Sequence, residues 1–348
     1  MSSRDATPVL SVRDLVTEFR TEAGVVAAVN GVSYDLFPGE TLGIVGESGS
    51  GKSVTVMSML GLVPNPPGRV TGGEVLFGGV DLLKIPGKRL RDIRGREIAM
   101  VFQDPMTSLN PVHTVGVQIA EALRAHDRKL SRRACRARAV ELLDLVGVPN
   151  AAERVRQYPH EFSGGMRQRA MIAIAIANHP KVLIADEPTT ALDVTIQAQV
   201  LEVLQAAQRE TGAATVLITH DLGLVAEMAD RVMVMYAGRV VESADVFTVF
   251  REPRHPYTVG LMTSLPRLDV DLDRLVPISG QPPNLISLPQ GCAFEPRCRI
   301  SRGREECTRL TPPLIRVGDG HRSACHFHGE LADTEAIRRE VDTGALER

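Results

Sequence analysis

Short runs of apolar, largely β-branched residues recur between residues 40 and 236, and segments with a helical pattern separate them. Such a run, bounded by turn residues, is typical of a strand that is buried on both faces of a sheet. Strands that alternate with helices form α/β layered domains. We therefore predict an α/β core sheet made of the strands Thr41–Val45, Ile98–Phe102, Val182–Ala185, Thr215–Thr219 and Val232–Met235.

Two further regions accompany this core. Leu10–Phe19 and Val25–Leu36 predict a pair of strands, joined through Thr21–Gly24, that form an antiparallel β subdomain. Between residues 114 and 178 many apolar residues are three and four positions apart, a spacing that is typical of amphipathic helices. We therefore predict a helical subdomain at about residues 105–178.

The chain changes character after residue 252, where prolines become frequent. Because proline lacks a backbone N–H and restricts the residue before it, long helices and strands are not expected there. We predict one domain over residues 1–252, an irregular C-terminal appendage over residues 253–332 and a polar tail over residues 333–348.

Composition narrows the class of protein. Lys and Arg number 40 and Asp and Glu 42 among the 348 residues, so the net charge of -2 gives no field that would attract nucleic acid. Apolar stretches such as Met171–Ala177 are far shorter than the roughly 18–20 residues that a membrane-spanning helix needs. Met1–Pro8 is polar and lacks the apolar segment of a secretory signal. We expect a cytoplasmic protein that binds no nucleic acid.

A glycine-rich segment between the strand Thr41–Val45 and a predicted helix has the spacing of a phosphate-binding loop. Its glycines let backbone N–H groups converge on a phosphate, and the helix N-terminus adds its partial positive charge. Lys52 would reach the terminal phosphates of ATP, and the Ser53 hydroxyl would bind magnesium. An ordinary glycine-rich turn is the alternative, and the flanking strand and helix argue against it. The segment is Gly46, Glu47, Ser48, Gly49, Ser50, Gly51, Lys52 and Ser53.

Two adjacent carboxylates, Asp186 and Glu187, follow the apolar run Val182–Ala185. The carboxyl ends of strands are where α/β sheets bind ligands. Asp186 suits magnesium, and Glu187, which points the other way along the strand, can polarise an attacking water as a general base. A solvated strand end or a helix cap is the alternative, and the phosphate loop favours the catalytic interpretation.

With these motifs in place, one further segment resembles the ATP-binding subunits of ABC transporters. Phe162–Arg169 is similar to the signature motif of that family and lies just before the acidic strand. The family usually has Leu and Gln where this chain has Phe162 and Met166, a departure that resembles the peptide-importer branch. The resemblance implies an ABC-type nucleotide-binding domain whose signature residues grip the terminal phosphate of ATP held by the opposite subunit. These residues are Ser163, Gly164, Gly165 and Met166.

The same resemblance implies roles for four other residues. Gln103 would contact magnesium and the attacking water and sense the membrane subunit, and His220 would contact the terminal phosphate of ATP. Asp193 would cross the interface between two ATPase subunits. Phe19 lies where the family places the aromatic residue that stacks on adenine, although the loop after it is longer than in the simplest members. Taken singly, Gln103, Asp193 and His220 would each be an ordinary polar surface residue, and their order along the chain supports the roles of these three.

The resemblance to oligopeptide and dipeptide importer ATPases extends from Leu10 to about His328, and Tyr158–Glu161 and Arg254–Thr258 are its most telling parts. It implies a peripheral protein at the cytoplasmic face of the cell membrane that hydrolyses ATP to power uptake of di- or oligopeptides. Its partners would be a second, related ATPase subunit, two transmembrane permease subunits and an extracytoplasmic substrate-binding protein. The branch also serves nickel, glutathione and sugar importers, so the substrate stays open.

Two other classes of function use some of these motifs. Soluble ABC ATPases that act on ribosomes or DNA usually hold two cassettes or long coiled coils, whereas this chain has one phosphate loop and no sustained heptads. Small-molecule kinases share the phosphate loop but would not need Ser163–Gly165 or Asp193. The transport ATPase is therefore the favoured hypothesis.

Four of the 5 cysteines lie in the proline-rich appendage, which has little capacity for a hydrophobic core. Small domains of this kind are often held together by a metal. The spacing matches neither the common zinc ribbons nor the bacterial ferredoxin runs, so it leaves a metal site and free thiols open. Some members of the peptide-importer branch carry a four-iron, four-sulfur (4Fe-4S) cluster. The resemblance favours such a cluster, with zinc as the alternative, at Cys292, Cys298, Cys307 and Cys325.

Overall fold

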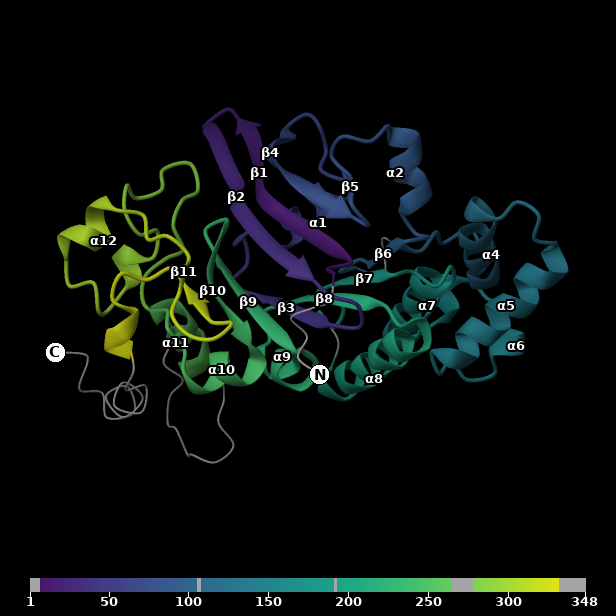
Figure 1. Ribbon diagram of the computed structural model, residues 1–348. Helices are drawn as coiled ribbons and strands as arrows, with labels where there is room; N and C mark the ends of the chain where they lie inside the picture. Colours follow the sequence, from purple (N-terminus) through teal and green to yellow (C-terminus); the bar gives the residue numbers. More distant parts are fainter. Residues whose placement is uncertain (1–6, 105–107, 191–192, 265–277, 332–348) are drawn as a thin grey trace. The chain divides into compact units, whose positions relative to one another are not determined.

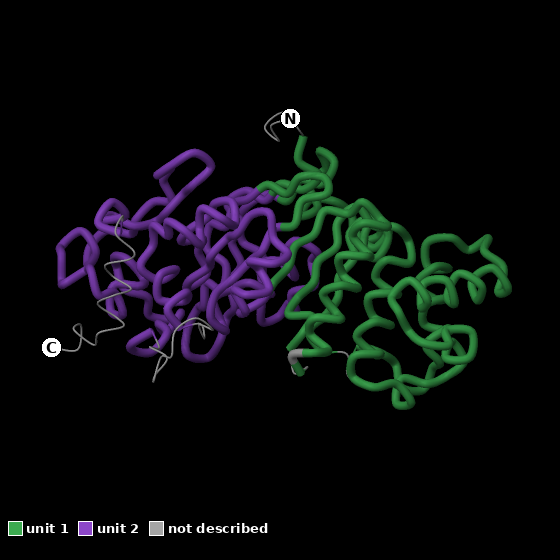
Figure 2. The backbone as a smooth tube through the Cα atoms, turned by 90° about the horizontal axis from the view of Figure 1, so that it is seen from below, with its two compact units in different colours: residues 1–11, 35–41, 75–218 green, residues 12–34, 42–74, 219–348 purple. Residues whose placement is uncertain are grey.

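The computed structural model describes residues 7–104, 108–190, 193–264 and 278–331 of the chain (Figure 1). The chain divides into two compact units, and neither is continuous in sequence (Figure 2). Unit 1 consists of residues 1–11, 35–41 and 75–218, and unit 2 consists of residues 12–34, 42–74 and 219–348. The predicted polar tail, residues 333–348, lies outside the described residues.

The strands of unit 1 form a parallel array in the order β8-β7-β6. All residues of β7 and β8 are buried, because both faces of these strands are covered, and their sequences are correspondingly rich in apolar residues. The core strands predicted for this region are confirmed to within one residue at each end. Their bounds are Ile98–Val101 for β6, Val182–Asp186 for β7 and Ala214–Thr219 for β8.

The helices predicted between residues 114 and 178 are present in unit 1, where α4, α5 and α7 pack on one another (Figure 1). Thr114 and Ser131 cap α4 and α5 by accepting hydrogen bonds from backbone N–H groups of the first turns, an arrangement that fixes where each helix begins. The helices of the unit are α2 Gly87–Ile93, α4 Val115–His126, α5 Arg132–Leu145, α6 Ala151–Arg154, η2 Pro159–Glu161, α7 Gly164–Ile176 and α8 Val194–Thr211.

Unit 2 contains a second array of strands, in the order β3-β9-β10-β12-β11. The strands β3 and β9 are parallel, and the remaining neighbours are antiparallel. The last two strands come from the proline-rich region, so the C-terminal segment adds strands to the sheet that contains β3, the strand before the phosphate loop. The bounds are Thr41–Val45 for β3, Arg231–Tyr236 for β9, Arg239–Asp245 for β10, Ile315–Arg316 for β11 and Arg322–Ser323 for β12.

A separate sheet has the order β2-β1-β4-β5. The strands β1 Leu10–Thr21 and β2 Gly24–Leu36 confirm the predicted pair, but β4 Gly68–Phe77 and β5 Val80–Asp81 were not predicted. The reason is local, since β4 carries three glycines and has an irregular burial pattern instead of an apolar alternation. The strand β10 was also missed, because its apolar run is broken by Glu242, which is nevertheless fully buried.

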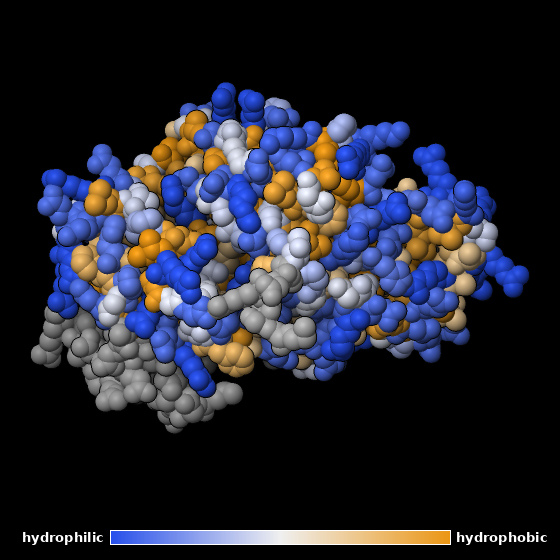
Figure 3. Space-filling view, viewed as in Figure 1, coloured by the Kyte–Doolittle hydropathy of each residue, from blue (hydrophilic) through white to orange (hydrophobic). Residues whose placement is uncertain are grey.

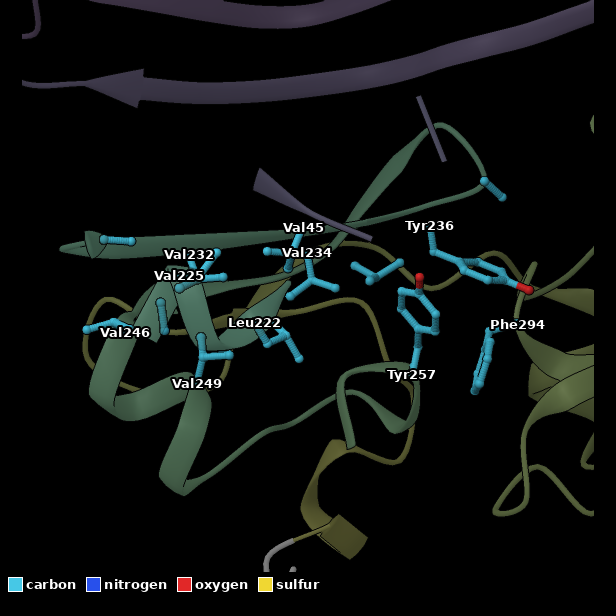
Figure 4. Packing of buried hydrophobic residues seen from close by; sticks show 14 residues of the cluster. Val45, Leu222, Val225, Val232, Val234, Tyr236, Val246, Val249, Tyr257 and Phe294 are labelled. Atoms are coloured by element: carbon cyan, nitrogen blue, oxygen red, sulfur yellow. The ribbon is translucent and has the colours of Figure 1, made fainter. Parts of the chain in front are cut away.

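The helices described after residue 219 are short, and α9, α10 and α11 contribute to a hydrophobic cluster of unit 2 (Figure 4). Aliphatic residues of β9, α9 and α10 fill one part of this cluster, and aromatic rings fill another. The short elements are α9 Leu222–Met228, α10 Val246–Arg251, α11 Pro256–Thr263, η3 Glu295–Arg297, α12 Glu305–Arg309 and η4 His328–Leu331.

The visible surface in Figure 3 is largely hydrophilic, with apolar residues in small patches. Among the described helices, none combines the length and the apolar character that crossing a membrane requires.

Candidate active site

The phosphate loop lies between β3 and the helix α1 Lys52–Met59 of unit 2. Gly46 and Gly51 have φ angles of 152° and 102°. A Cβ at Gly46 would collide with the carbonyl oxygen of Met235, and one at Gly51 would collide with that of Ala28. Both positions therefore need glycine for its backbone conformation and for the close approach of neighbouring backbone.

Lys52 is the first residue of α1, and its side chain is almost wholly enclosed, since the residue is 4% exposed. Its ammonium group donates hydrogen bonds to the carbonyl oxygens of Gly46 at 2.8 Å and Glu47 at 3.1 Å. A charge with so little access to water needs such partners. The Lys52 ammonium group, which the sequence predicts to bind the phosphates of ATP, is therefore held by carbonyl groups of the loop itself.

Unit 1 brings two predicted site residues together. The Glu187 carboxylate accepts hydrogen bonds from the Gln103 side-chain amide at 3.0 Å and from the Thr190 hydroxyl at 2.9 Å. The Glu187 backbone has a φ of 47°, which is uncommon outside glycine, and its N–H donates to Ile218 O at 2.9 Å. Asp186, at the end of β7, is buried. Backbone and side chain together hold the Glu187 carboxylate in one position.

The signature residues lie at the start of α7. Ser163 is exposed and caps the helix, with its hydroxyl accepting a hydrogen bond from the Met166 N–H at 3.4 Å. A Cβ at Gly165 would lie 2.7 Å from the Ile196 side chain, so glycine lets α7 pack closely on α8. Asp193 is exposed and caps α8 by accepting from Ile196 N–H at 3.0 Å. Both residues therefore stand at exposed helix N-termini of unit 1.

Two further predicted residues, Phe19 and His220, belong to unit 2. Phe19 is partly buried on β1, where its ring lies so close to Gly68 that a Cβ there would be 2.8 Å away. His220 is exposed and directly follows β8. Their predicted contacts with a nucleotide stay predictions.

The four late cysteines are free thiols that line one small cavity of unit 2. Burial raises the pKa of Cys292 to about 11 and that of Cys325 to about 12, and it raises the pKa of Cys298 and Cys307 as well. Yet among the described residues, which include all four cysteines, no three His, Cys, Asp or Glu side chains are arranged to hold a metal ion. The structure therefore does not support the metal site expected here, because thiols that share a cavity still need convergent sulfur atoms to form one.

Sequence reasoning missed three residues that contact the predicted site. Thr190 holds the Glu187 carboxylate, and Arg297 and Tyr257 contact Glu47 in the phosphate loop. Thr190 is three residues after Glu187, so the spacing within one turn offered a signal. The contact of Arg297 with Glu47 joins positions 250 residues apart and left no local pattern in the sequence.

Comparison with known proteins gives two family matches. The ABC transporter family matches residues 29–190, and the family described as the oligopeptide/dipeptide transporter C-terminal region matches residues 241–307. Solved structures agree with the first match. The dimeric ATP-binding cassette MJ0796 bound to ADP and Pi has a TM-score of 0.61 at 27% identity and covers 68% of this chain and 98% of its own. The structure of cbiO1 from Clostridium perfringens, part of an ABC transporter complex, has a TM-score of 0.59 at 29% identity and covers 70% and 91%.

Curated relatives match over most of the chain. The dipeptide transport ATP-binding protein DppD of Bacillus subtilis is 51% identical over 325 residues, which cover 93% of this chain and 96% of the relative. The oligopeptide transport ATP-binding protein OppD of Mycobacterium tuberculosis is 54% identical over 346 residues, which cover 97% of this chain and 56% of that longer relative. A putative peptide import ATP-binding protein of Brucella melitensis is 52% identical and covers 93% and 98%.

The predicted α/β class and the ABC-type ATPase fold are thereby confirmed. The second family match begins in β10 and ends in α12, so it includes the residues that pack against the phosphate loop. The chain belongs to the ATP-binding subunits of ABC transporters, in the oligopeptide/dipeptide transport family.

Proposed function

We propose that this chain is the ATP-hydrolysing motor of a bacterial importer of di- or oligopeptides. One observation carries the proposal: a single chain presents both a phosphate loop with an enclosed lysine and, at the exposed start of α7, a second helix N-terminus that suits a phosphate. Two such chains, facing each other, would each complete the ATP site of the other. The names of the curated relatives support dipeptides or oligopeptides as the substrate class.

Within this mechanism the residues take the roles that the sequence suggested. Lys52 binds the terminal phosphates, Phe19 stacks on adenine, and His220 contacts the terminal phosphate. Glu187 acts as general base on the attacking water, with Gln103 and Thr190 holding its carboxylate in place. Ser163 and the glycines after it bind the phosphate of the opposite subunit, and Asp193 lies at the interface between subunits.

Magnesium is part of the proposal, because the predicted ligands carry the oxygen donors that this ion prefers. Gln103 and Asp186 of unit 1 carry an amide and a carboxylate oxygen, and Ser53 of unit 2 carries a hydroxyl oxygen. When bound, the ion neutralises the charge that develops on the phosphates. Asp186 is buried at the end of β7, where a nearby cation would compensate the cost of burying its charge.

The proposed setting is the cytoplasmic face of the cell membrane, where the chain acts as a peripheral subunit. Its partners are a second, related ATPase, two transmembrane permease subunits and an extracytoplasmic substrate-binding protein. Import of nickel, glutathione or sugars by the same motor, and a soluble ABC ATPase without a transport role, are the competing proposals. Co-purification from native membranes, followed by identification of bound permeases and binding protein, separates them.

The isolated chain is expected to be mostly monomeric and to hydrolyse ATP weakly. Each ATP site needs Ser163 of one subunit opposite Lys52 of another, and removal of donors that stabilise charge in a transition state costs tenfold or more. Adding the cognate ATPase and permeases should therefore raise the rate of phosphate release per chain by at least about tenfold. Phosphate release and sedimentation are measured together. Full activity as a dilute monomer would contradict the shared site.

A second part of the proposal concerns the cysteine cavity. We keep a 4Fe-4S cluster, with zinc as the alternative, as a proposal, because Cys292, Cys298, Cys307 and Cys325 all line one cavity. Against it stands the lack of a metal-ready arrangement among the described residues. The domain limits 1–252, 253–332 and 333–348 also stay proposals, and the C-terminal family match at residues 241–307 supports a distinct segment there.

Metal analysis decides the matter. Protein purified without oxygen is expected to be brown and to contain about four irons per chain, with thiolate-to-iron absorption. Cys307→Ser should lose the iron, whereas Cys135→Ser, which changes the buried cysteine of α5, should keep it. About one zinc per chain in colourless protein would favour the alternative. If the protein contains neither iron nor zinc, the four cysteines are free thiols and no metal holds the appendage together.

A further inference from the structure

Glu47, the second residue of the phosphate loop, is held by residues from the C-terminal segment. Both oxygens of its carboxylate accept from Arg297, at 2.7 Å from Nη1 and 2.9 Å from Nη2. Its backbone N–H donates to the Tyr257 hydroxyl at 2.7 Å. A bidentate pair of this kind fixes geometry as well as charge. The loop is therefore tied to the C-terminal segment through both the main chain and the side chain of one residue.

The groups that hold Glu47 are themselves immobilised. The Arg297 side chain is 4% exposed, and its Nε donates to Ser279 O at 3.1 Å. Tyr236, Tyr257 and Phe294 form an aromatic group with ring centroids 4.6 to 5.4 Å apart (Figure 4). The Arg297 guanidinium lies 5.9 Å from the ring centroids of Tyr236 and Phe294. An ion pair that packs against buried aromatic rings is poorly screened by water and by salt.

The same loop residue contacts the phosphate-binding lysine. The Glu47 carbonyl accepts from the Lys52 ammonium, as the Gly46 carbonyl does. Displacement of Glu47 would therefore move the oxygens that position Lys52. It would also leave a carboxylate without its counter-charge in a loop that has to accept the anionic phosphates of ATP.

We propose that Arg297 and Tyr257 are positioning residues for ATP binding, which hold the phosphate loop and neutralise Glu47, so that the C-terminal segment sets the nucleotide affinity of the ATPase. The proposal rests on the proposed nucleotide site. We call the contacts of Arg297 and Tyr257 with Glu47 the clamp. Cys298 directly follows Arg297 in sequence, so the segment that lines the cysteine cavity also carries part of this clamp. A change in the packing of that cavity would therefore shift Arg297 and, through it, Glu47 of the phosphate loop.

The test measures the dissociation constant for ATP with magnesium, by calorimetry on the full chain. Arg297→Gln is expected to weaken ATP binding at least about tenfold, since it removes a bidentate charged pair. Arg297→Lys keeps the charge but loses the two-pronged guanidinium geometry, so its ATP affinity should lie between those of the unchanged chain and Arg297→Gln. The double variant Glu47→Gln with Arg297→Gln should bind no more weakly than Arg297→Gln alone, because the two residues act through one pair.

Arg304→Ala is the matched control, because Arg304 lies in the same segment but forms its ion pair with Glu330, at 2.7 Å, and not with Glu47. It should leave ATP affinity within about twofold. Equal weakening by Arg304→Ala and Arg297→Gln would overturn the proposal, since both would then act through general loosening of the segment. A double variant that binds ATP more weakly than Arg297→Gln alone would also overturn it.

Lys52→Ala separates this proposal from the proposed site. If Lys52→Ala weakens binding and Arg297→Gln does not, the clamp is wrong and the site stands. If neither weakens binding, the nucleotide site itself is wrong. Should Arg297→Gln fail to fold, Tyr257→Phe decides, because it keeps the buried ring and removes only the hydroxyl that accepts from Glu47. Binding weakened about threefold or more supports the clamp, and unchanged affinity overturns it.

Discussion

Replacement of Glu187 by Gln is expected to lower ATP turnover at least about 100-fold while ATP binding is retained, because the change removes the general base and preserves the shape of the side chain. The structure sharpens this expectation. The Glu187 carboxylate already accepts from Gln103 and Thr190, and a glutamine oxygen can accept the same hydrogen bonds. The variant should therefore keep its geometry and lose only its basicity.

The measurement is phosphate release by the assembled transporter, with the partner ATPase substituted likewise so that a second intact site does not mask the loss. Glu121→Gln, which changes an exposed glutamate of α4, serves as the matched control and should leave turnover within about twofold. Near-normal turnover of the Glu187 variant would remove the catalytic role from this residue.

Lys52→Ala is expected to weaken ATP binding by at least about 30-fold. Hydrogen bonds to charged groups contribute about 1.5–3 kcal/mol each, and 1.4 kcal/mol corresponds to a factor of ten in affinity. Lys52 is 4% exposed, so its interaction with phosphate oxygens is poorly screened by water. Loss of the side chain also frees the Gly46 and Glu47 carbonyls that it now contacts.

Calorimetry with ATP and magnesium measures this effect on the isolated chain. Lys84→Ala is the control, because the Lys84 side chain is 68% exposed and forms an ion pair with Asp81 of β5 at 2.9 Å, outside the phosphate loop. That substitution should leave ATP affinity unchanged, as exposed ion pairs contribute little. An unaltered affinity in the Lys52 variant would show that the loop is not the phosphate site.

The parts of the fold that the sequence predicted are those with a strong local pattern. The strands β7 and β8 were found because every residue in them is buried, which makes both segments rich in apolar and β-branched residues. The strand β4 was missed because its glycines and exposed positions resemble a loop. The strand β10 was missed because the buried Glu242 interrupts it, and its carboxylate is satisfied by His321 from a distant segment.

The candidate site divides in the same way. The phosphate loop and the signature motif were readable because contiguous residues with a fixed spacing perform the chemistry. The contact between Gln103 and Glu187 joins residues 84 positions apart, and the contact between Arg297 and Glu47 joins residues 250 positions apart. Such pairings depend on the folded chain, so sequence spacing alone could not place them. The cysteine spacing likewise gave no sign of the cavity that the thiols share.

The most direct measurement is peptide uptake by proteoliposomes that contain the permeases, the partner ATPase and this chain. The binding protein and a labelled peptide are supplied on one side of the membrane, and ATP is supplied on the other side, where the ATPases lie. Accumulation of labelled di- or oligopeptide is predicted to require ATP hydrolysis and to be abolished by Lys52→Ala and by Glu187→Gln, with Lys84→Ala without effect. Uptake that persists in both site variants, or ATP-dependent uptake of another solute with none of peptide, would contradict the assignment of this chain as the motor of a peptide importer.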